Sequence, residues 1–169
     1  MYIGIDPSLT NTAIVVLECM NDVVTVIDTD LIHIPSGKLW RDQVHRVHGI
    51  YERIVNKFEL AKDVCIVLEG YSYSSRFQSH QLGELGYVLR YWMSFYTAAY
   101  VVPPKTIIKF VTGKGNATKK DVAEHIKCTY GFSFPTLHHS DACAAALFGV
   151  GIAKGQVWRN LDTYRGKII

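Results

Sequence analysis

Apolar residues change their spacing several times along the chain, and each change predicts a different element. Short runs over residues 1–6, 12–19 and 23–34 are rich in apolar and β-branched residues, and polar breaks at 8–11 and 21–22 separate them. Such runs divided by short polar turns are typical of neighbouring strands in an antiparallel meander. We therefore expect the chain to open with three antiparallel strands.

The rest of the chain alternates helical periods with shorter apolar runs. The predicted elements are a helix over 39–59, a strand over 63–69, a helix over about 81–98, a strand over 100–102, a short helix over about 105–111, a helix from about 118 to 128 and a last helix over about 140–154. Thr118 and Asp121 resemble the capping box that starts a helix. This order predicts an α/β fold with a mixed five-stranded sheet, three antiparallel then two parallel strands, and helices on both faces.

The long helix over about 81–98 is apolar on two sides. One stripe consists of Leu82, Leu85, Leu89, Trp92 and Tyr96, and a second consists of Tyr87, Val88, Tyr91 and Phe95. The two stripes cannot both face the sheet, and a soluble domain rarely leaves a large apolar patch in water. We expect the second stripe to be covered by another body.

Composition fits a single globular domain. The chain has 169 residues, of which 49% are hydrophobic and 20% charged. We expect a domain over residues 1–155 and a basic C-terminal tail over 156–169. No apolar stretch approaches the roughly 20 residues of a membrane span. The first strand starts without a basic leader, and the cysteines have no CxxC spacing, so we expect a protein of the cytoplasm, or of the host cytoplasm if it is viral.

Positive charge is concentrated although the net charge is only +3. The segment from 105 to 120 contains no acidic residue and five lysines: Lys105, Lys109, Lys114, Lys119 and Lys120. A basic segment of this kind suits a polyanionic substrate such as a nucleic acid.

Three carboxylates occupy matching positions. Asp6 and Glu69 each end an apolar run, and Asp141 lies at the predicted start of the last helix with His138 three residues before it. Carboxylates at the ends of buried strands are poorly solvated and repel one another, so such a group needs cations. Oxygen ligands select hard cations such as Mg²⁺ or Mn²⁺, and a pair of these ions hydrolyses phosphodiesters.

Four motifs together resemble one known family. They are Gly4-Ile5-Asp6-Pro7-Ser8, Leu68-Glu69-Gly70, Lys114-Gly115-Asn116-Ala117-Thr118-Lys119-Lys120 and His138-His139-Ser140-Asp141-Ala142. Their order and spacing are similar to those of the RuvC family of Holliday junction resolvases. The resemblance covers residues 3 to about 154 and extends to phage-type members, one of which this chain can be. It implies the ribonuclease H-like fold and structure-selective cleavage of four-way and other branched DNA.

The resemblance also implies roles for particular residues. Asp6, Glu69 and Asp141 match the family's metal-binding and catalytic carboxylates, and they imply two Mg²⁺ or Mn²⁺ ions per active site. The fourth ligand is His138 or His139. Helical spacing favours His138, because residues three apart share a helix face and residues two apart do not.

The DNA contacts and the assembly follow from the same resemblance. The loop after Glu69 matches the segment that inserts an aromatic residue at the junction centre; Tyr71 is the first candidate, followed by Tyr73 and Phe77, with Arg76 beside them. Lys119 or Lys120 would hold the phosphate near the site. A homodimer through the long helix would make paired nicks. Two other functions share some of these features: an actin-like or sugar-kinase-type phosphotransferase, and an inactive protein that binds branched DNA.

Overall fold

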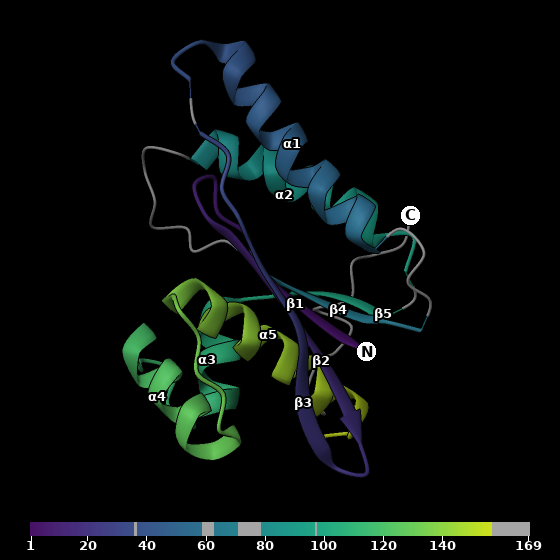
Figure 1. Ribbon diagram of the computed structural model, residues 1–169, viewed down its shortest axis with the longest axis vertical. Coiled ribbons are helices and arrows are strands. Elements are labelled where there is room, and N and C mark those ends of the chain that lie inside the picture. The colour runs from purple at the N-terminus through teal and green to yellow at the C-terminus, as the bar shows by residue number, and fades with distance from the viewer. Residues whose placement is uncertain (36, 59–62, 71–78, 97, 157–169) are drawn as a thin grey trace.

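The computed structural model describes residues 1–35, 37–58, 63–70, 79–96 and 98–156 (Figure 1). The elements in chain order are β1 (Tyr2–Asp6), β2 (Thr12–Met20), β3 (Val23–Ile32), α1 (Trp40–Phe58), β4 (Cys65–Glu69), α2 (Ser79–Met93), β5 (Ala98–Val102), α3 (Pro104–Thr112), α4 (Lys119–Tyr130) and α5 (Leu137–Ala153). The predicted basic tail lies outside the described residues from position 157 onward.

The five strands form one mixed sheet in the order β3-β2-β1-β4-β5. β1, β2 and β3 pair antiparallel, whereas β4 pairs parallel with β1 and with β5. Helices α1 and α2 lie on one side of the sheet, and α3, α4 and α5 lie on the other (Figure 1). This architecture confirms the predicted α/β fold with three antiparallel strands, two parallel strands and helices on both faces.

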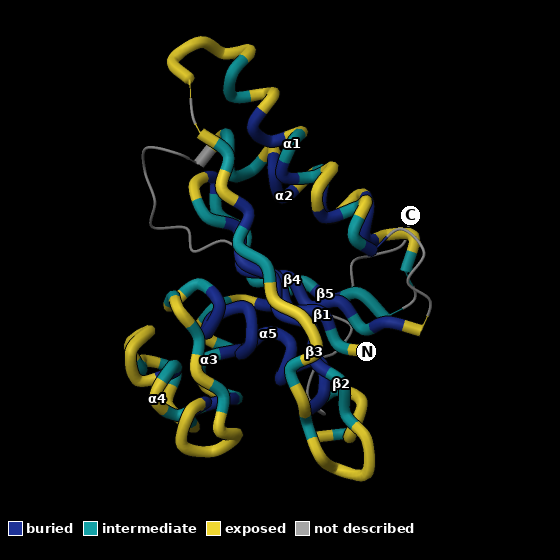
Figure 2. Tube along the Cα trace, in the orientation of Figure 1, coloured by how far each residue is buried: buried dark blue, intermediate teal, exposed yellow. Residues whose placement is uncertain are grey.

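The sheet separates two apolar cores. On the first side, Ile3, Ile5 and Ile66 of the sheet pack with residues of α1 and α2, including Ile50 and Leu89. On the second side, residues of β2, β4 and β5 pack with α3, α4 and α5 in a separate cluster. Helix α5 is buried along nearly its whole length, as Figure 2 shows in dark blue, whereas α1 and α4 are exposed on their outer faces.

Helix α2 is shorter than predicted. It ends at Met93 instead of about Ala98, and β5 begins at Ala98 instead of Tyr100. Tight backbone hydrogen bonds replace the helical pattern, from Phe95 N to Trp92 O and from Tyr96 N to Met93 O. The end of this helix depends on such local contacts and on the hydroxyl of Tyr96, which donates to the Phe58 carbonyl at 3.0 Å.

The two apolar stripes of the long helix have different fates. In the first stripe Leu85, Leu89 and Trp92 are buried, and Leu82 and Tyr96 pack against the same core. In the second stripe Tyr87, Tyr91 and Phe95 are 66%, 58% and 70% exposed. Val88 departs from the predicted grouping, because it is half-buried against the α1–α2 core. In the part of the chain that the structure describes, three large aromatic side chains of α2 and of the turn after it therefore remain in water.

Within the described ranges, no helix is long and apolar enough to cross a bilayer.

Candidate active site

Two carboxylates lie side by side at one edge of the sheet. β1 and β4 run parallel with Ile5 opposite Leu68, so Asp6 and Glu69 follow directly at the same ends of neighbouring strands. Asp6 is 7% exposed and Glu69 is half-buried. Because the carboxyl ends of parallel strands meet at one edge, the two apolar runs bring these acids together without any long connection.

Helix α5 brings the third carboxylate to the same edge through a close contact with β1. An added Cβ at Gly4 would lie 1.9 Å from the carbonyl oxygen of Ala142 and 2.4 Å from the backbone nitrogen of Ala146. Only glycine permits this approach of helix backbone to strand backbone. Asp141 directly precedes Ala142 and is 6% exposed. The position of the third carboxylate therefore depends on the missing side chain at Gly4.

The start of α5 differs from the prediction in a way that matters for the site. The helix begins at Leu137 and not at about Ser140, because Thr136 caps it: the Thr136 hydroxyl accepts from the backbone N–H of His139. His138 therefore lies inside the first turn, and its Nδ1 is 2.8 Å from Asp6 Oδ2. His139 points elsewhere, with its Nδ1 2.8 Å from the Thr136 hydroxyl. Of the two candidate histidines, His138 is the one that contacts the carboxylates.

A lysine from α4 completes the group. Thr118 and Asp121 form the predicted capping box, which fixes the start of α4. Lys119, the first residue after the cap, donates a hydrogen bond to Asp141 and forms an ion pair with it. The capping box thus decides where the ammonium group lies, and it places a cation directly on the third carboxylate.

The carboxylates affect one another's protonation. Burial raises the pKa of Glu69 to about 8, and the charges of Asp6 and Asp141 add to the effect. Burial also raises the pKa of Asp141, although the hydrogen bond and charge of Lys119 oppose the change. Raised pKa values at a shared site show that the protein alone does not fully stabilise the charged forms of these acids.

The pKa values of the two cations are raised as well, which for a base favours the charged form. The hydrogen bond to Asp6 raises the pKa of His138, and partial burial opposes this. Partial burial lowers the pKa of Lys119, but its hydrogen bond to Asp141 and the three negative charges outweigh burial and raise it. In this form of the protein, His138 and Lys119 supply the positive charge that the carboxylates need.

The donor set fits a divalent metal, although the ligands are not gathered around a metal position. Carboxylate oxygens and one imidazole are the ligands that Mg²⁺ and Mn²⁺ accept. Within the residues that the structure describes, no group of three or more His, Cys, Asp or Glu side chains has the geometry of a ready-made metal site. Asp6 and Asp141 are instead paired with His138 and Lys119. A metal would therefore compete with these internal cations for the same oxygens.

Comparison with known proteins identifies the family. Residues 2–148 match the family described as crossover junction endodeoxyribonuclease RuvC. The chain belongs to the RuvC family. The members of this family are metal-dependent nucleases that hydrolyse DNA phosphodiester bonds. None of the curated proteins compared with the chain matches it in sequence.

Solved structures support the same fold. The Thermus thermophilus RuvC structure and the T. thermophilus RuvC in complex with Holliday junction substrate each superpose with a TM-score of 0.71 at 18% sequence identity. Each match covers 91% of this chain, together with 95% and 94% of the respective Thermus chain. These matches confirm the predicted ribonuclease H-like, RuvC-type architecture.

Of the predicted DNA-binding lysines, Lys119 contacts Asp141 in the site, and the other four have no ion pair with the carboxylates among the described residues. Lys105 and Lys109 are exposed on α3, Lys114 is exposed in the loop after α3, and Lys120 is exposed on α4. Gly115 lies within van der Waals contact of α3, since an added Cβ would be 3.6 Å from the Lys105 carbonyl. The loop therefore packs against α3 and keeps these lysines on one side of the molecule. Their role in binding DNA stays a prediction.

The other predicted DNA contacts cannot be placed. Tyr71, Tyr73, Arg76 and Phe77 lie in the segment 71–78, outside the described residues. Conversely, the sequence analysis missed Gly4 and Thr136. The run of alanines that follows Asp141 was the available signal for a close helix contact, and a threonine just before the helix was the signal for its cap.

Proposed function

We propose that this RuvC-family chain resolves Holliday junctions, and cuts other branched DNA, through the site formed by Asp6, Glu69, His138 and Asp141. The observation that carries the proposal is the convergence of three carboxylates at one sheet edge, next to an exposed group of lysines. The pKa values of two of these acids, Glu69 and Asp141, are raised. Phosphodiester hydrolysis by a divalent metal is the chemistry that this donor set serves best.

The four residues of the site would be the ligands of two Mg²⁺ or Mn²⁺ ions. Asp6 would supply oxygens to both ions, Glu69 would complete one set of ligands, and His138 and Asp141 would complete the other. When bound, such ions lower the pKa of a water molecule and neutralise charge on the phosphate. Lys119 would leave Asp141 when a metal binds there and would then be free to hold a phosphate oxygen of the substrate.

The exposed aromatic face of α2 supports a homodimer. Tyr87, Tyr91 and Phe95 stand in water, and the rings of Tyr91 and Phe95 already pack edge to face at 5.3 Å. A second copy related by a two-fold axis would bury these rings against their equivalents. It would also present two active sites to two strands, which paired nicking requires. Membership of the RuvC family removes the support for a sugar-kinase-type phosphotransferase.

Cleavage of synthetic junctions tests the proposal directly. The wild-type protein should cut a four-way junction in Mg²⁺ or Mn²⁺ and should leave it intact in EDTA. Asp141→Asn should lower the single-turnover rate by more than about 100-fold, since even partners of metal ligands are worth 10- to 100-fold. Asp22→Asn, at an exposed acid on the β2–β3 turn, is the matched control and should cut normally.

Two results would contradict the proposal. A wild-type protein that binds four-way junctions but cuts them under no divalent metal would indicate the inactive DNA-binding alternative. Normal cutting by Asp141→Asn would remove this carboxylate from the site. Linear duplex of the same sequence serves as the substrate control, because a structure-selective enzyme should leave it uncut.

A further inference from the structure

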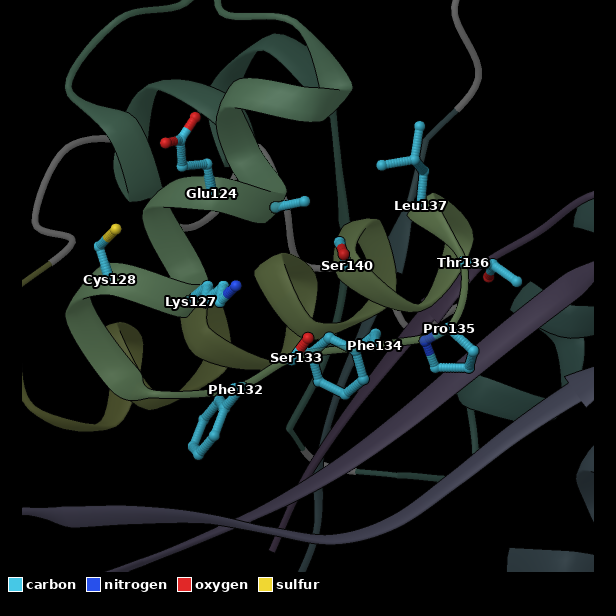
Figure 3. Close-up of a pocket in the computed structure, with 11 residues that line it drawn as sticks. Glu124, Lys127, Cys128, Phe132, Ser133, Phe134, Pro135, Thr136, Leu137 and Ser140 are labelled. Carbon is cyan, nitrogen blue, oxygen red and sulfur yellow. The ribbon is translucent and has the colours of Figure 1, made fainter.

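A cavity of about 440 Å³ lies between α4 and the segment 132–137 that leads into α5 (Figure 3). Its volume is within the range of ligand sites. Ser140 of α5 is part of its lining, and it directly precedes Asp141. Successive residues of a helix are only about 100° and 1.5 Å apart, so the cavity opens one helix face away from the catalytic side chains.

Several polar side chains line the cavity. Ser140 is 3% exposed, and its hydroxyl is not among the fully buried side-chain atoms that lack a partner in the described part of the chain, so the cavity is where it is accessible. The ion pairs among the described residues do not include Lys127. Figure 3 shows the Lys127 ammonium and the hydroxyls of Ser133 and Ser140 pointing toward the same central space, while the Glu124 carboxylate points away.

This arrangement fits a phosphate attached to an apolar body. The Ser140 hydroxyl, the exposed Ser133 and the exposed Lys127 are open to a ligand in the cavity. One ammonium and two hydroxyls are donors for phosphate oxygens, and they match the contacts by which proteins hold a DNA backbone. The rings of Phe132 and Phe134 form an apolar side of the same cavity, against which a sugar or base can pack.

We propose that this cavity is a subsite for the DNA strand being cut, in which Lys127, Ser133 and Ser140 hold the phosphate of a nucleotide next to the scissile one. The inference rests on the proposed function, since it takes the strand at Asp141 as its ligand. It adds a contact on a face of α4 and α5 that bears neither a carboxylate of the active site nor a lysine of the basic segment 105–120. Through this contact the strand is held on two neighbouring faces of α5.

Junctions with one neutral phosphate test the subsite. A methylphosphonate is placed at single positions on either side of the scissile phosphate, and binding is measured in EDTA. In the wild type, one flanking position should weaken binding by about tenfold, the value for one charge-assisted hydrogen bond. In Lys127→Ala the same methylphosphonate should have no further effect, and Lys127→Arg should restore its effect. Ser140→Ala should reduce the effect of the methylphosphonate at that position only.

A charge-matched control is Lys154, the C-cap of α5. Lys154 lies 14 residues after Ser140, about 21 Å away along α5, and pairs with the exposed Asp22. Lys154→Ala should leave every methylphosphonate effect unchanged, although it removes the same charge as Lys127→Ala. If Lys127→Ala and Lys154→Ala weaken binding equally at all positions, the Lys127 contribution is general charge and the subsite is overturned.

Cys128 gives an independent readout without mutation. It lines the cavity and is the exposed one of the four free cysteines. Bound junction should slow its alkylation at least about tenfold, whereas inorganic phosphate or a free nucleotide at the same phosphate concentration should not. If inorganic phosphate slows the alkylation of Cys128 and bound junction does not, the cavity is a site for free anions and the proposal is overturned. If the wild type cuts junctions but Lys127→Ala does not change the effect of any methylphosphonate, the subsite alone is overturned. If the wild type neither binds nor cuts junctions, the proposed function is overturned as well.

Discussion

The two helical layers of this molecule use their apolar residues in opposite ways. On the α5 side, small residues let the helix lie against the sheet so closely that nearly all of it is buried. On the α2 side, large aromatic residues fill the contact with α1, and three more remain in water. The first layer therefore fixes the positions of the candidate catalytic groups, and the second leaves exposed the aromatic surface that the proposed homodimer would cover.

The contrast also applies to charge. The α5 layer contains buried carboxylates whose negative charge Lys119 and His138 only partly balance. The described face of α2 contains no such group; its exposed residues are aromatic or singly charged. Repulsion between buried acids reduces the stability of the fold, whereas an exposed aromatic face destabilises the monomer only slightly. Each layer thus keeps one feature that an isolated monomer does not need.

The largest expected effect comes from a pair of glycine substitutions, one in each layer. Gly4→Ala should remove the fold or cost at least about 3 kcal/mol of unfolding free energy, because the new methyl group overlaps the α5 backbone. Gly83→Ala in α2 should instead stabilise by roughly 0.5–1 kcal/mol, since nothing lies within 4 Å of the added Cβ and alanine favours the helix. Denaturant unfolding measures both; a mild Gly4→Ala would show that α5 can shift without harm.

Sequence patterns predicted what depends on neighbours along the chain. The strand ends at Asp6 and Glu69 and the capping box of Thr118 and Asp121 are local patterns, and the structure contains them. The end of α2 at Met93 was predicted wrongly, because helical periodicity continues past it while the hydrogen bonding changes. That change is linked to a distant partner, the Phe58 carbonyl that receives the Tyr96 hydroxyl.

The finer geometry of the site could not be predicted from the sequence, for the same reason. The contact of Lys119 with Asp141 joins residues 22 positions apart, and that of His138 with Asp6 joins residues 132 apart. The pattern of apolar runs pointed to the three carboxylates and the resemblance assigned them as metal ligands, but no pattern along the chain shows which cation meets which acid. The cavity between α4 and α5 was missed altogether, since its lining residues share neither a motif nor a period.

The next effect tests the open face of α2. Tyr91→Glu should weaken self-association by more than about 100-fold, because it places a charge in the centre of an aromatic contact. The variant should stay folded, since Tyr91 is 58% exposed. Sedimentation at several concentrations measures the dimer, and cutting of the two junction strands should become uncoordinated. Arg90→Glu introduces the same residue one position away and should leave the dimer intact.

A wild-type protein that sediments as a monomer at micromolar concentration, both free and on DNA, would show that the α2 face does not associate. The contrast between the layers would then concern packing alone.

A smaller effect tests the raised pKa of Glu69. The pKa of Glu69 is raised to about 8, so the folded state binds a proton that the unfolded state releases near pH 4.5. Stability of the metal-free protein should therefore fall as pH rises from about 4.5 to 8. Glu69→Gln should remove this part of the slope and be more stable at pH 8, by an amount on the order of a few kcal/mol or less. Mg²⁺ should stabilise the wild type at pH 8 more than the variant; parallel pH profiles would contradict the assignment.

The smallest expected effect concerns the cap that positions Lys119. Thr118→Ala removes the side-chain acceptor of the Asp121 N–H and should cost about 1 kcal/mol of stability. Since the start of α4 frays, the Lys119 ammonium should contact Asp141 less often, and the rate of junction cutting should change while α2-mediated association does not. Thr118→Ser keeps the hydroxyl and is the matched control. Equal stability of the two variants would show that Asp121 alone fixes this turn, whereas a loss of association in Thr118→Ala would show that the two layers are not independent.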